Sequence, residues 1–349
     1  MNKLIAITLG DPAGIGPEII AKAFWDWPDV TRDCFVVGDA ATMRRAIDCV
    51  SAGRIPLPVM VIDTPEEALD APPRCVPVLQ CGTLSAVVPF GQLNAQAGQL
   101  AGDCVVWAAK AALRGEIAAL VTAPLNKEAL ALACPPHSTY PGHTEMLQAL
   151  SADHALVSQE KMPVRMMLAN EELRVVLVSI HVSLRDAINA VTFENVLQTL
   201  LITHAALSAA LGRAPRIGVA GLNPHAGEGG LFGREEMEVI TPAIEAAQQQ
   251  GLDVSGPFAP DTVFMRARAS SGKPGEFDVV VAMYHDQGLI PVKYLGVDEG
   301  VNVTLGLPLV RTSPDHGTAF DIAGKGLASA ASLIAAIRMA QRLCDLPKA

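Results

Sequence analysis

The sequence predicts an α/β protein built from two α/β/α domains with a cleft between them. Short apolar runs rich in β-branched residues alternate with helix-length segments along most of the 349 residues. This alternation is the pattern of parallel strands joined by crossover helices. Half of the residues are hydrophobic, and a chain of this length is expected to bury two cores rather than one.

The first domain is predicted to consist of residues 1–138 together with residues 315–349. A clear amphipathic helix over about residues 100–114 is closed by Gly115, since glycine readily adopts the left-handed conformation that ends helices. The last helix, residues 327–343, is rich in alanine and is expected to pack back on this domain. The strands expected in this domain are residues 4–9, 35–38, 58–62 and 118–122.

The second domain is predicted to span residues 139–314. Its first two strands, residues 164–169 and 174–180, flank a polar turn at Asn170 and Glu171 and therefore indicate an antiparallel hairpin. The elements expected after the hairpin are a helix near residues 192–211, a strand at 216–220, a helix near 234–250, an exposed loop at 270–276 and a strand at 278–283.

Composition excludes several classes of function. The net charge is −10 and no block of Lys or Arg is present, which argues against binding to nucleic acid or to an anionic membrane. The first apolar run is too short for a signal peptide, and no stretch approaches the roughly 18 apolar residues of a membrane span. Seven cysteines without a C-x-x-C pair indicate reduced thiols. We therefore expect a cytoplasmic protein.

Three histidines stand just beyond three predicted strands. His181 follows the strand at 174–180, His225 follows the strand at 216–220, and His285 follows the strand at 278–283. Ligands of parallel α/β sheets collect outside the carboxyl ends of the strands, so these imidazoles could converge on one crevice. Three neutral imidazoles suit zinc, cobalt or a similar divalent cation and leave coordination positions open for a substrate. The spacing does not match H-E-x-x-H, and any single histidine could instead be an ordinary core or surface residue.

Three further features suggest binding of an anion. Gly142 and Glu145 flank His143 and Thr144 at the start of a helical run, where main-chain N–H groups and the helix dipole favour phosphate, although an ordinary threonine cap would give the same pattern. The GDPAGIGPE segment at residues 10–18 is a tight polar loop that matches neither the Rossmann nor the P-loop motif, and a plain turn remains an alternative. Three polar residues punctuate an apolar region and suggest an anionic ligand or a buried salt bridge: Lys293, Asn302 and Arg311.

Together, six segments in the same order along nearly the whole chain resemble the 4-hydroxythreonine-4-phosphate dehydrogenase family of pyridoxine biosynthesis. They are GDPAGIGPE (10–18), TAPLNKEAL (122–130), YPGHTEML (140–147), GLNPHAGEGGLFGREE (221–236), MYHDQG (283–288) and GVNVTLGLPLVRTSPDHGTAFDIAGKG (300–326).

The resemblance implies a fold like that of isocitrate and isopropylmalate dehydrogenases and a homodimer with shared active sites, whose dimer contacts and metal ligands lie in the second domain. It implies divalent-metal ligands (zinc, magnesium, manganese or cobalt) at His181, His225 and His285. It implies substrate contacts at His143, Thr144, Lys293, Asn302 and Arg311, and NAD or NADP contacts at His316, Gly317, Thr318 and Asp321.

The chemistry expected from this resemblance is oxidation of the secondary alcohol of a small phosphorylated hydroxy acid, followed by decarboxylation of the β-keto acid. The metal would polarise the hydroxyl and the nicotinamide would take the hydride. Lys293 is the candidate general acid or base, with a charge clamp as the alternative. The stretch at 137–147 is more similar to the 4-phosphothreonate or 4-phosphoerythronate branch than to the vitamin B6 branch.

Three other functions remain open from the sequence. A relative that oxidises a cis-dihydrodiol of terephthalate has a substrate without phosphate, and His143, Thr144 and Arg311 argue against that substrate here. A three-histidine zinc hydrolase would activate water and need no nicotinamide. A non-catalytic phosphoacid-binding protein would need no metal.

Overall fold

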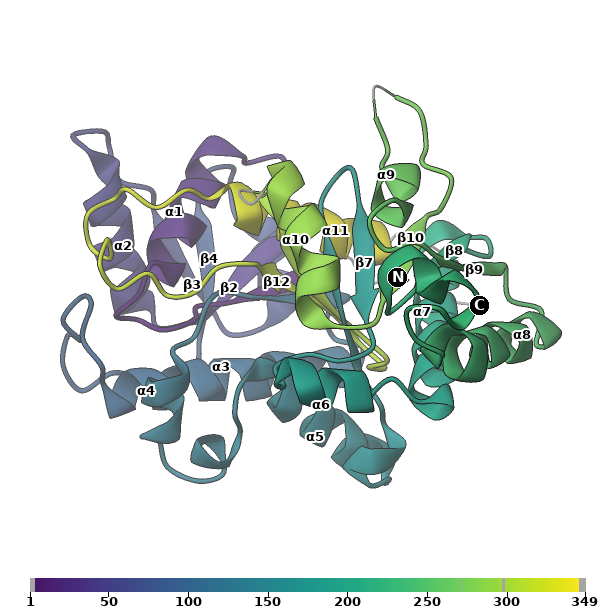
Figure 1. The fold of residues 1–349 in the computed structure, drawn as a ribbon. Helices are drawn as coiled ribbons and strands as arrows, with labels where there is room; N and C mark the ends of the chain where they lie inside the picture. The colour runs from purple at the N-terminus through teal and green to yellow at the C-terminus, as the bar shows by residue number, and fades with distance from the viewer. Residues whose placement is uncertain (1–3, 271, 297–298, 345–349) are drawn as a thin grey trace. The chain divides into compact units, whose positions relative to one another are not determined.

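The computed structural model describes residues 4–270, 272–296 and 299–344, which form two compact units (Figure 1). The first unit takes its residues from Met1–Pro163 and Leu307–Cys344, and the second from Val164–Gly306. Both units are α/β, as the sequence predicts. The sequence predicted domain boundaries after residues 138 and 314, whereas the units of the structure divide after residues 163 and 306.

The first unit contains a sheet whose paired strands are all parallel. Three of the six strands described in this unit are buried along their whole length, because helices cover both faces, and such strands carry nearly continuous apolar runs. The strand order is β3 (Val59–Ile62), β4 (Val76–Gln80), β2 (Cys34–Gly38), β1 (Ile5–Thr8), β5 (Ala119–Thr122) and β12 (Val310–Pro314).

Helices α1 (Gly16–Asp26), α2 (Ala40–Ser51) and α11 (Ala331–Cys344) cover one face of this sheet, and α3 (Ala95–Leu113) covers the other (Figure 1). The return of the last helix to the first unit is confirmed. Helix α3 begins five residues before the predicted start, because Asn94 caps it by accepting from the Gln96 and Ala97 amides. The shorter elements are 3₁₀ turns at Pro65–Asp70, His137–Thr139 and Gln159–Lys161 and helix α4 (Lys127–Ala131).

Two tertiary contacts explain the shift of the unit boundaries. Helix α5 (His143–Ala155) packs on α3, so the chain leaves the first unit only after residue 163. Strand β12 pairs with β5, with Arg311 beside Leu120, so the chain re-enters the first unit at residue 307. Both contacts join segments that are distant in sequence, so local sequence patterns do not predict them.

The second unit has a mixed sheet. Strand β6 is antiparallel to both β11 and β7, as the predicted hairpin requires, whereas β7, β10, β8 and β9 run parallel. Helices α7 and α8 lie against one face, and α9 and α10 contact strands of the same sheet. The strand order is β11 (Val301–Leu305), β6 (Arg165–Ala169), β7 (Arg174–Leu177), β10 (Val279–Ala282), β8 (Ile217–Ala220) and β9 (Val254–Phe258). The helical segments are α6 (Leu184–Asn189), α7 (Phe193–Leu211), η4 (Pro224–Gly230), η5 (Glu236–Ile240), α8 (Thr241–Gln249), α9 (Val263–Ala267) and α10 (His285–Gly296).

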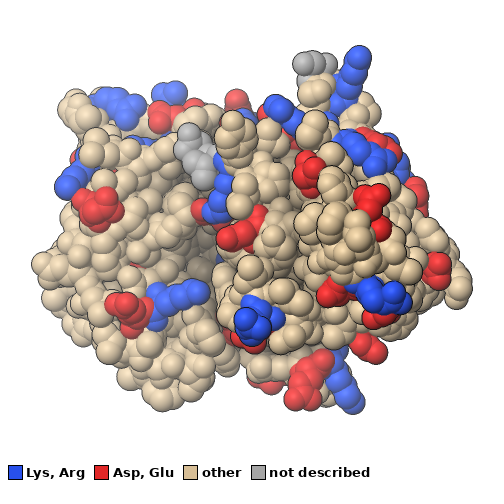
Figure 2. All heavy atoms as spheres, viewed as in Figure 1, with Lys and Arg blue, Asp and Glu red and all other residues tan. Residues whose placement is uncertain are grey.

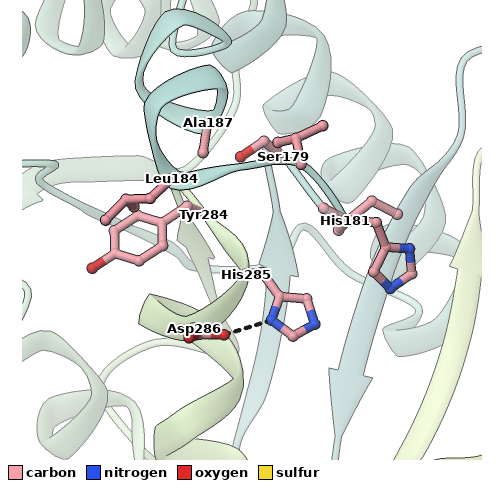
Figure 3. Close-up of a pocket in the computed structure, with 9 residues that line it drawn as sticks. Ser179, His181, Leu184, Ala187, Tyr284, His285 and Asp286 are labelled. Carbon is pink, nitrogen blue, oxygen red and sulfur yellow. Dashed lines mark hydrogen bonds and ion pairs between the residues drawn. The ribbon is translucent and has the colours of Figure 1, made fainter.

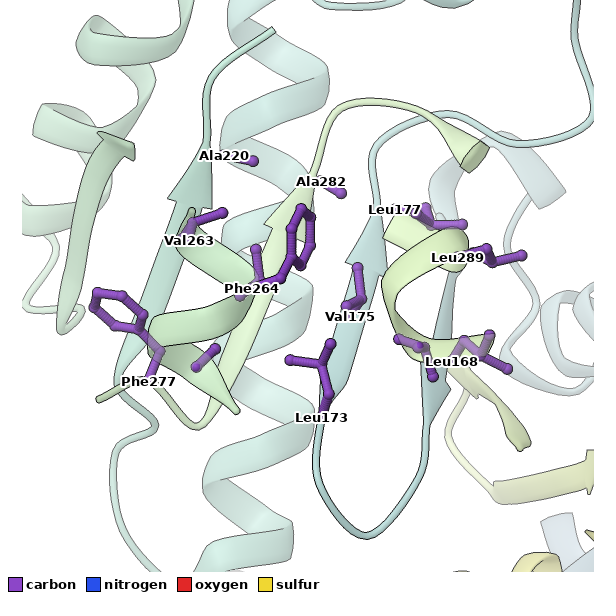
Figure 4. Close-up of a cluster of buried hydrophobic side chains, with 13 residues drawn as sticks. Leu168, Leu173, Val175, Leu177, Ala220, Val263, Phe264, Phe277, Ala282 and Leu289 are labelled. Atoms are coloured by element: carbon purple, nitrogen blue, oxygen red, sulfur yellow. The ribbon is translucent and has the colours of Figure 1, made fainter. Parts of the chain in front are cut away.

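A buried apolar cluster holds α9 and α10 on this sheet (Figure 4). Phe264 of α9 and Leu289 of α10 pack with strand residues such as Val280, which is fully buried. Fully burying a side chain of this size stabilises the fold by about 1.5–3 kcal/mol. The cluster therefore anchors the start of α10, which carries His285, against the ends of β7 and β10.

The surface agrees with the composition. On the face shown in Figure 2, Lys and Arg side chains alternate with Asp and Glu side chains, and neither sign gathers into a large patch. None of the helices in the described part of the chain combines the length and the hydropathy needed to cross a membrane.

Candidate active site

The three histidines lie at the predicted edge of the second unit. Strands β7, β10 and β8 are adjacent and parallel, so the segments that follow them leave the sheet at the same edge. His181 follows β7, His225 lies in the η4 segment after β8, and His285 is the first residue of α10 after β10. The alternating pattern of the sequence was sufficient to place them there.

His181 and His285 form a pair. Their ring centroids are 5.7 Å apart, and both line a cavity of about 390 Å³ with Ser179, Tyr284 and Asp286 (Figure 3). The Ser179 hydroxyl donates to the Met283 carbonyl at 3.0 Å and so joins the two loops that carry these rings.

The pair fits a divalent cation. A nitrogen–zinc bond is about 2.0–2.1 Å long, so two rings at this separation can reach one ion. The His285 Nδ1 lies 2.7 Å from the Asp286 carboxylate, and in Figure 3 that carboxylate lies on the side of the ring away from His181. A carboxylate bound to one ring nitrogen orients the other as a ligand, which is common around protein-bound metals.

His225 stands apart from that pair. It lines a second cavity, of about 690 Å³, that shares Tyr284 and Asp286 with the first, and its ring centroid is 6.1 Å from that of Phe232. Over residues 4–270, 272–296 and 299–344, no three His, Cys, Asp or Glu side chains of a single chain gather as a metal-binding group. One chain thus brings two of the three predicted ligands together.

The backbone around His225 is left-handed. Five consecutive residues from His225 to Gly229 have φ between 43° and 81°, and three of them, His225, Ala226 and Glu228, are not glycine. A left-handed conformation costs such residues about 1–2 kcal/mol each. Strain of this kind persists only where the surroundings enforce it, and it concentrates at functional sites. His181 also has a positive φ, of 48°.

The base of this loop is held by Glu236, whose side chain is buried. Its Oε1 accepts from the main-chain N–H groups of Leu222 and Asn223, each at 2.7 Å. Gln287 makes a second link, because its amide donates to the Gly221 carbonyl at 2.7 Å and its Oε1 accepts from the Met283 N–H at 2.7 Å. The segments bearing His225 and His285 are therefore tied to one another.

A separate polar cluster lies in the first unit. Arg311 is 4% exposed, and its Nε and Nη2 donate to the Thr122 hydroxyl at 3.1 and 2.7 Å. Burial lowers the pKa of Arg311 to about 10, and nearby Glu145 opposes that shift. The guanidinium remains charged at neutral pH, so the site presents a buried cation.

His143 is the first residue of α5, with Thr144, half-buried, next to it. The His143 Nε2 is buried and has no hydrogen-bond partner within the described chain. Its pKa lies well below the usual value because of burial and because Arg311 and Lys127 are close by. A neutral imidazole beside two cations at a helix N-terminus is a site for an anion.

Lys127 belongs to this cluster although the sequence reasoning missed it. It begins α4 after the Asn126 cap, and its Cε lies 3.5 Å from the point where a Cβ on Gly142 would be. The Glu145 carboxylate lies at the same distance from that point. In the sequence, the TAPLNKEAL segment contributes only to the family resemblance, since a lysine at the start of a helix is common on surfaces.

Hydrogen bonds from the GDPAGIGPE segment, residues 10–18, hold the predicted cofactor-binding segment in place. Glu18 is fully buried and accepts from the Gly324 and Gly326 amides, the latter at 2.9 Å, while the Ile15 amide donates to the Thr318 carbonyl at 3.0 Å. The other predicted contacts, His316, Gly317 and Asp321, lie in the same loop, with Gly317 and Asp321 exposed.

The two remaining predicted substrate residues lie in the second unit. Asn302 is half-buried on β11, and Lys293 is exposed on α10. The sequence suggested apolar surroundings for Lys293, but in this single chain the side chain is exposed to solvent.

Comparison with known proteins agrees with these features. A family model described as pyridoxal phosphate biosynthetic protein PdxA matches residues 30–340. A 4-hydroxythreonine-4-phosphate dehydrogenase of Beijerinckia indica is 50% identical over 97% of this chain and 94% of that protein. A D-threonate 4-phosphate dehydrogenase of Pectobacterium atrosepticum is 43% identical over 98% of this chain and 100% of that protein.

A crystal structure of 4-hydroxythreonine-4-phosphate dehydrogenase from Klebsiella pneumoniae matches with a TM-score of 0.84 at 42% identity, over 99% of this chain and 100% of that one. The predicted α/β fold and the predicted family are thereby confirmed. The chain belongs to the PdxA family and is an oxidoreductase like 4-hydroxythreonine-4-phosphate dehydrogenase.

Proposed function

We propose that the chain oxidises the secondary alcohol of a phosphorylated hydroxy acid, of the 4-phosphohydroxy-L-threonine or D-threonate 4-phosphate type, with NAD or NADP and a divalent cation. The β-keto acid product then loses carbon dioxide. The observation that carries this proposal is the cluster formed by buried Arg311 and by His143 at the start of α5, because both groups suit a substrate phosphate.

The phosphate end of the substrate is assigned to the first unit. Arg311 offers a planar guanidinium that can bond two phosphate oxygens at once, and Lys127 adds a second positive charge. Neutral His143 can donate from Nε2, and the α5 N-terminus presents main-chain N–H groups. These residues bind and orient the substrate.

The reacting end is assigned to His181, His225 and His285 as metal ligands. His181, His225 and His285 would hold a divalent cation that would supply Lewis-acid polarisation of the hydroxyl, and His316, Gly317, Thr318 and Asp321 would hold NAD or NADP as the hydride acceptor. Lys293 and Asn302 contact the substrate, with Lys293 as proton carrier or charge clamp.

A homodimer completes the site in this proposal. One chain pairs His181 with His285 and leaves His225 in a neighbouring cavity, so a second copy is the source of the third ligand. Large apolar side chains near both cavities are exposed in the single chain, which is typical of a surface that another protein covers. They are Val182, Leu184, Ile188, Leu231, Phe232, Ile290 and Tyr294.

All three alternative functions lose support. Membership in a dehydrogenase-like family favours oxidation over the zinc hydrolase and over a non-catalytic binding protein. The buried cation at Arg311 favours a phosphorylated substrate over an unphosphorylated dihydrodiol.

A spectrophotometric screen tests the proposal. Phosphorylated C4 hydroxy acids and their dephosphorylated analogues are incubated with NAD or NADP, with and without zinc, magnesium, manganese or cobalt. We expect reduced nicotinamide only with metal, and far faster with the phosphorylated acids. Equal rates on both kinds of acid would contradict the phosphate assignment, and unchanged rates after chelation would contradict the metal assignment.

A further inference from the structure

We infer that Glu236 is a positioning residue that fixes the left-handed loop 224–230 and thereby presents His225 for metal binding. The inference rests on the proposed function only in taking His225 as a ligand. Glu236 lies outside every set of metal, substrate and cofactor residues assigned above.

The first support is the set of groups that meet at the Glu236 carboxylate. Its side chain is 2% exposed. One oxygen accepts from the Leu222 and Asn223 N–H groups, each at 2.7 Å, and the other accepts from the Asn223 side-chain amide at 3.0 Å. Hydrogen bonds to an ionised carboxylate are shorter and stronger than neutral ones, so this side chain holds the chain entering the loop.

The second support is how closely the loop packs on the carboxylate. A Cβ on Gly227 would lie 2.7 Å from the Glu236 Oε2, and a Cβ on Gly221 would lie 3.1 Å from Oε1. Gly227 also has a φ of 81°, which favours glycine. The loop therefore closes directly over Glu236, with His225 two residues from the point of contact.

The third support is the helix from which Glu236 projects. Residues Glu236–Ile240 form a π-helical turn immediately before α8. Single π turns within helices are uncommon and occur often at functional sites.

Glu235 provides the matched control. Its carboxylate accepts from the same Asn223 side chain, at 2.7 Å, but the main-chain N–H groups of Leu222 and Asn223 donate to Glu236 instead. Glu235→Gln and Glu236→Gln thus make the same chemical change in adjacent residues, and only the second weakens the acceptor of the Leu222 and Asn223 N–H groups, which precede the loop.

The experiment compares the full-length protein with Glu236→Gln, Glu236→Ala, Glu235→Gln and His225→Ala. Hydrogen exchange of the metal-free protein reports on the loop, and titration with Co²⁺, followed by its absorption spectrum, reports on the metal site. In Glu236→Gln we expect amides of residues 222–230 to exchange at least tenfold faster. We expect Co²⁺ affinity to fall about 10- to 100-fold, the usual effect of losing a group that supports a ligand. Glu235→Gln should change both quantities less than twofold.

The outcomes separate this inference from the proposed function. Unchanged exchange in both Glu236 variants would overturn the inference, whatever the metal does. Faster exchange with unchanged Co²⁺ affinity, while His225→Ala binds weakly, would also overturn it, because Glu236 would then be merely structural. Wild-type Co²⁺ affinity in His225→Ala would instead contradict the ligand assignment, and the exchange rates would still decide whether Glu236 fixes the loop. If Glu236→Ala does not fold, the hydrogen exchange and the Co²⁺ affinity of Glu236→Gln test the inference.

Discussion

Two nitrogens of Arg311 donate to one oxygen of Thr122, at 3.1 and 2.7 Å, inside the first unit. Thr122 carries no charge, so this contact fixes the orientation of the guanidinium without neutralising it. This arrangement, with neutral His143 and with Lys127 nearby, is the basis for the first two predictions.

Arg311→Met is expected to lower kcat/KM for the phosphorylated acid by about 10- to 150-fold, because a charge-assisted bond contributes roughly 1.5–3 kcal/mol. The slow rate on the dephosphorylated analogue should hardly change. Thr122→Val, which removes only the orienting hydroxyl, should have a smaller effect. Steady-state kinetics on both acids measure this, and an equal loss on both would show that Arg311 does not bind the phosphate.

Lys127→Met is expected to raise KM for the phosphorylated acid about tenfold, the effect of one weak charge-assisted bond, with kcat little changed. Lys110→Met, on the exposed side of α3, is the control for loss of a positive charge. The dependence of kcat/KM on salt should weaken in the first variant only. If both variants behave alike, Lys127 acts through net charge and not at the site.

Sharing of the metal site predicts a specific pattern among heterodimers. Because His181 and His285 are 5.7 Å apart in one chain, a His225→Ala subunit joined to a His285→Ala subunit should contain one intact site and regain about half of the activity per dimer. A His181→Ala subunit joined to a His285→Ala subunit should remain inactive.

Tandem affinity purification of differently tagged subunits, followed by assay with added Co²⁺, measures these activities. Recovery in the second combination would place His181 and His285 on opposite subunits of one site. Absence of recovery in every combination would exclude sharing.

The buried carboxyl of Asp11 is expected to give the stability of the folded chain an unusual dependence on pH. Burial raises the pKa of this carboxyl from 3.8 to about 6, partly opposed by the Ala13 amide, which donates to Oδ1 at 2.8 Å. Between these values the folded chain holds a proton that the unfolded chain has lost. Asp11 therefore makes folding less favourable as pH rises from about 4 to 6, and the cost remains above pH 6.

Asp11→Asn should keep the Oδ1 bond, remove the charge, and raise the free energy of unfolding by about 1–3 kcal/mol at pH 7.5. Near pH 4 the two proteins should be equally stable. Urea unfolding at both pH values measures this, with Asp48→Asn, at an exposed position of α2, as the control. A loss of stability at both pH values would mean that the ionised carboxylate has a partner that stabilises it.

The alternating apolar pattern predicted the parts of the fold whose signal is local. Strands β1, β2, β3, β5, β8 and β10, the β6–β7 hairpin and helices α3, α7 and α11 lie close to their predicted positions. The same local reasoning located His143 at a helix N-terminus and the three histidines after parallel strands. These features depend on neighbouring residues alone, since periodicity shows where a strand or helix ends.

Only the tertiary structure determined the features that depend on contacts between residues distant in sequence. Pairing with β5 assigned β12, and hence Arg311, to the first unit, and packing on α3 did the same for α5. The sequence did not predict strands β4, β9 and β11, which become strands by pairing with neighbouring strands that are distant in sequence. The separation of His225 from the His181–His285 pair, and the buried Glu236 beneath its left-handed loop, arise from hydrogen bonds and steric limits between segments, which periodicity does not encode.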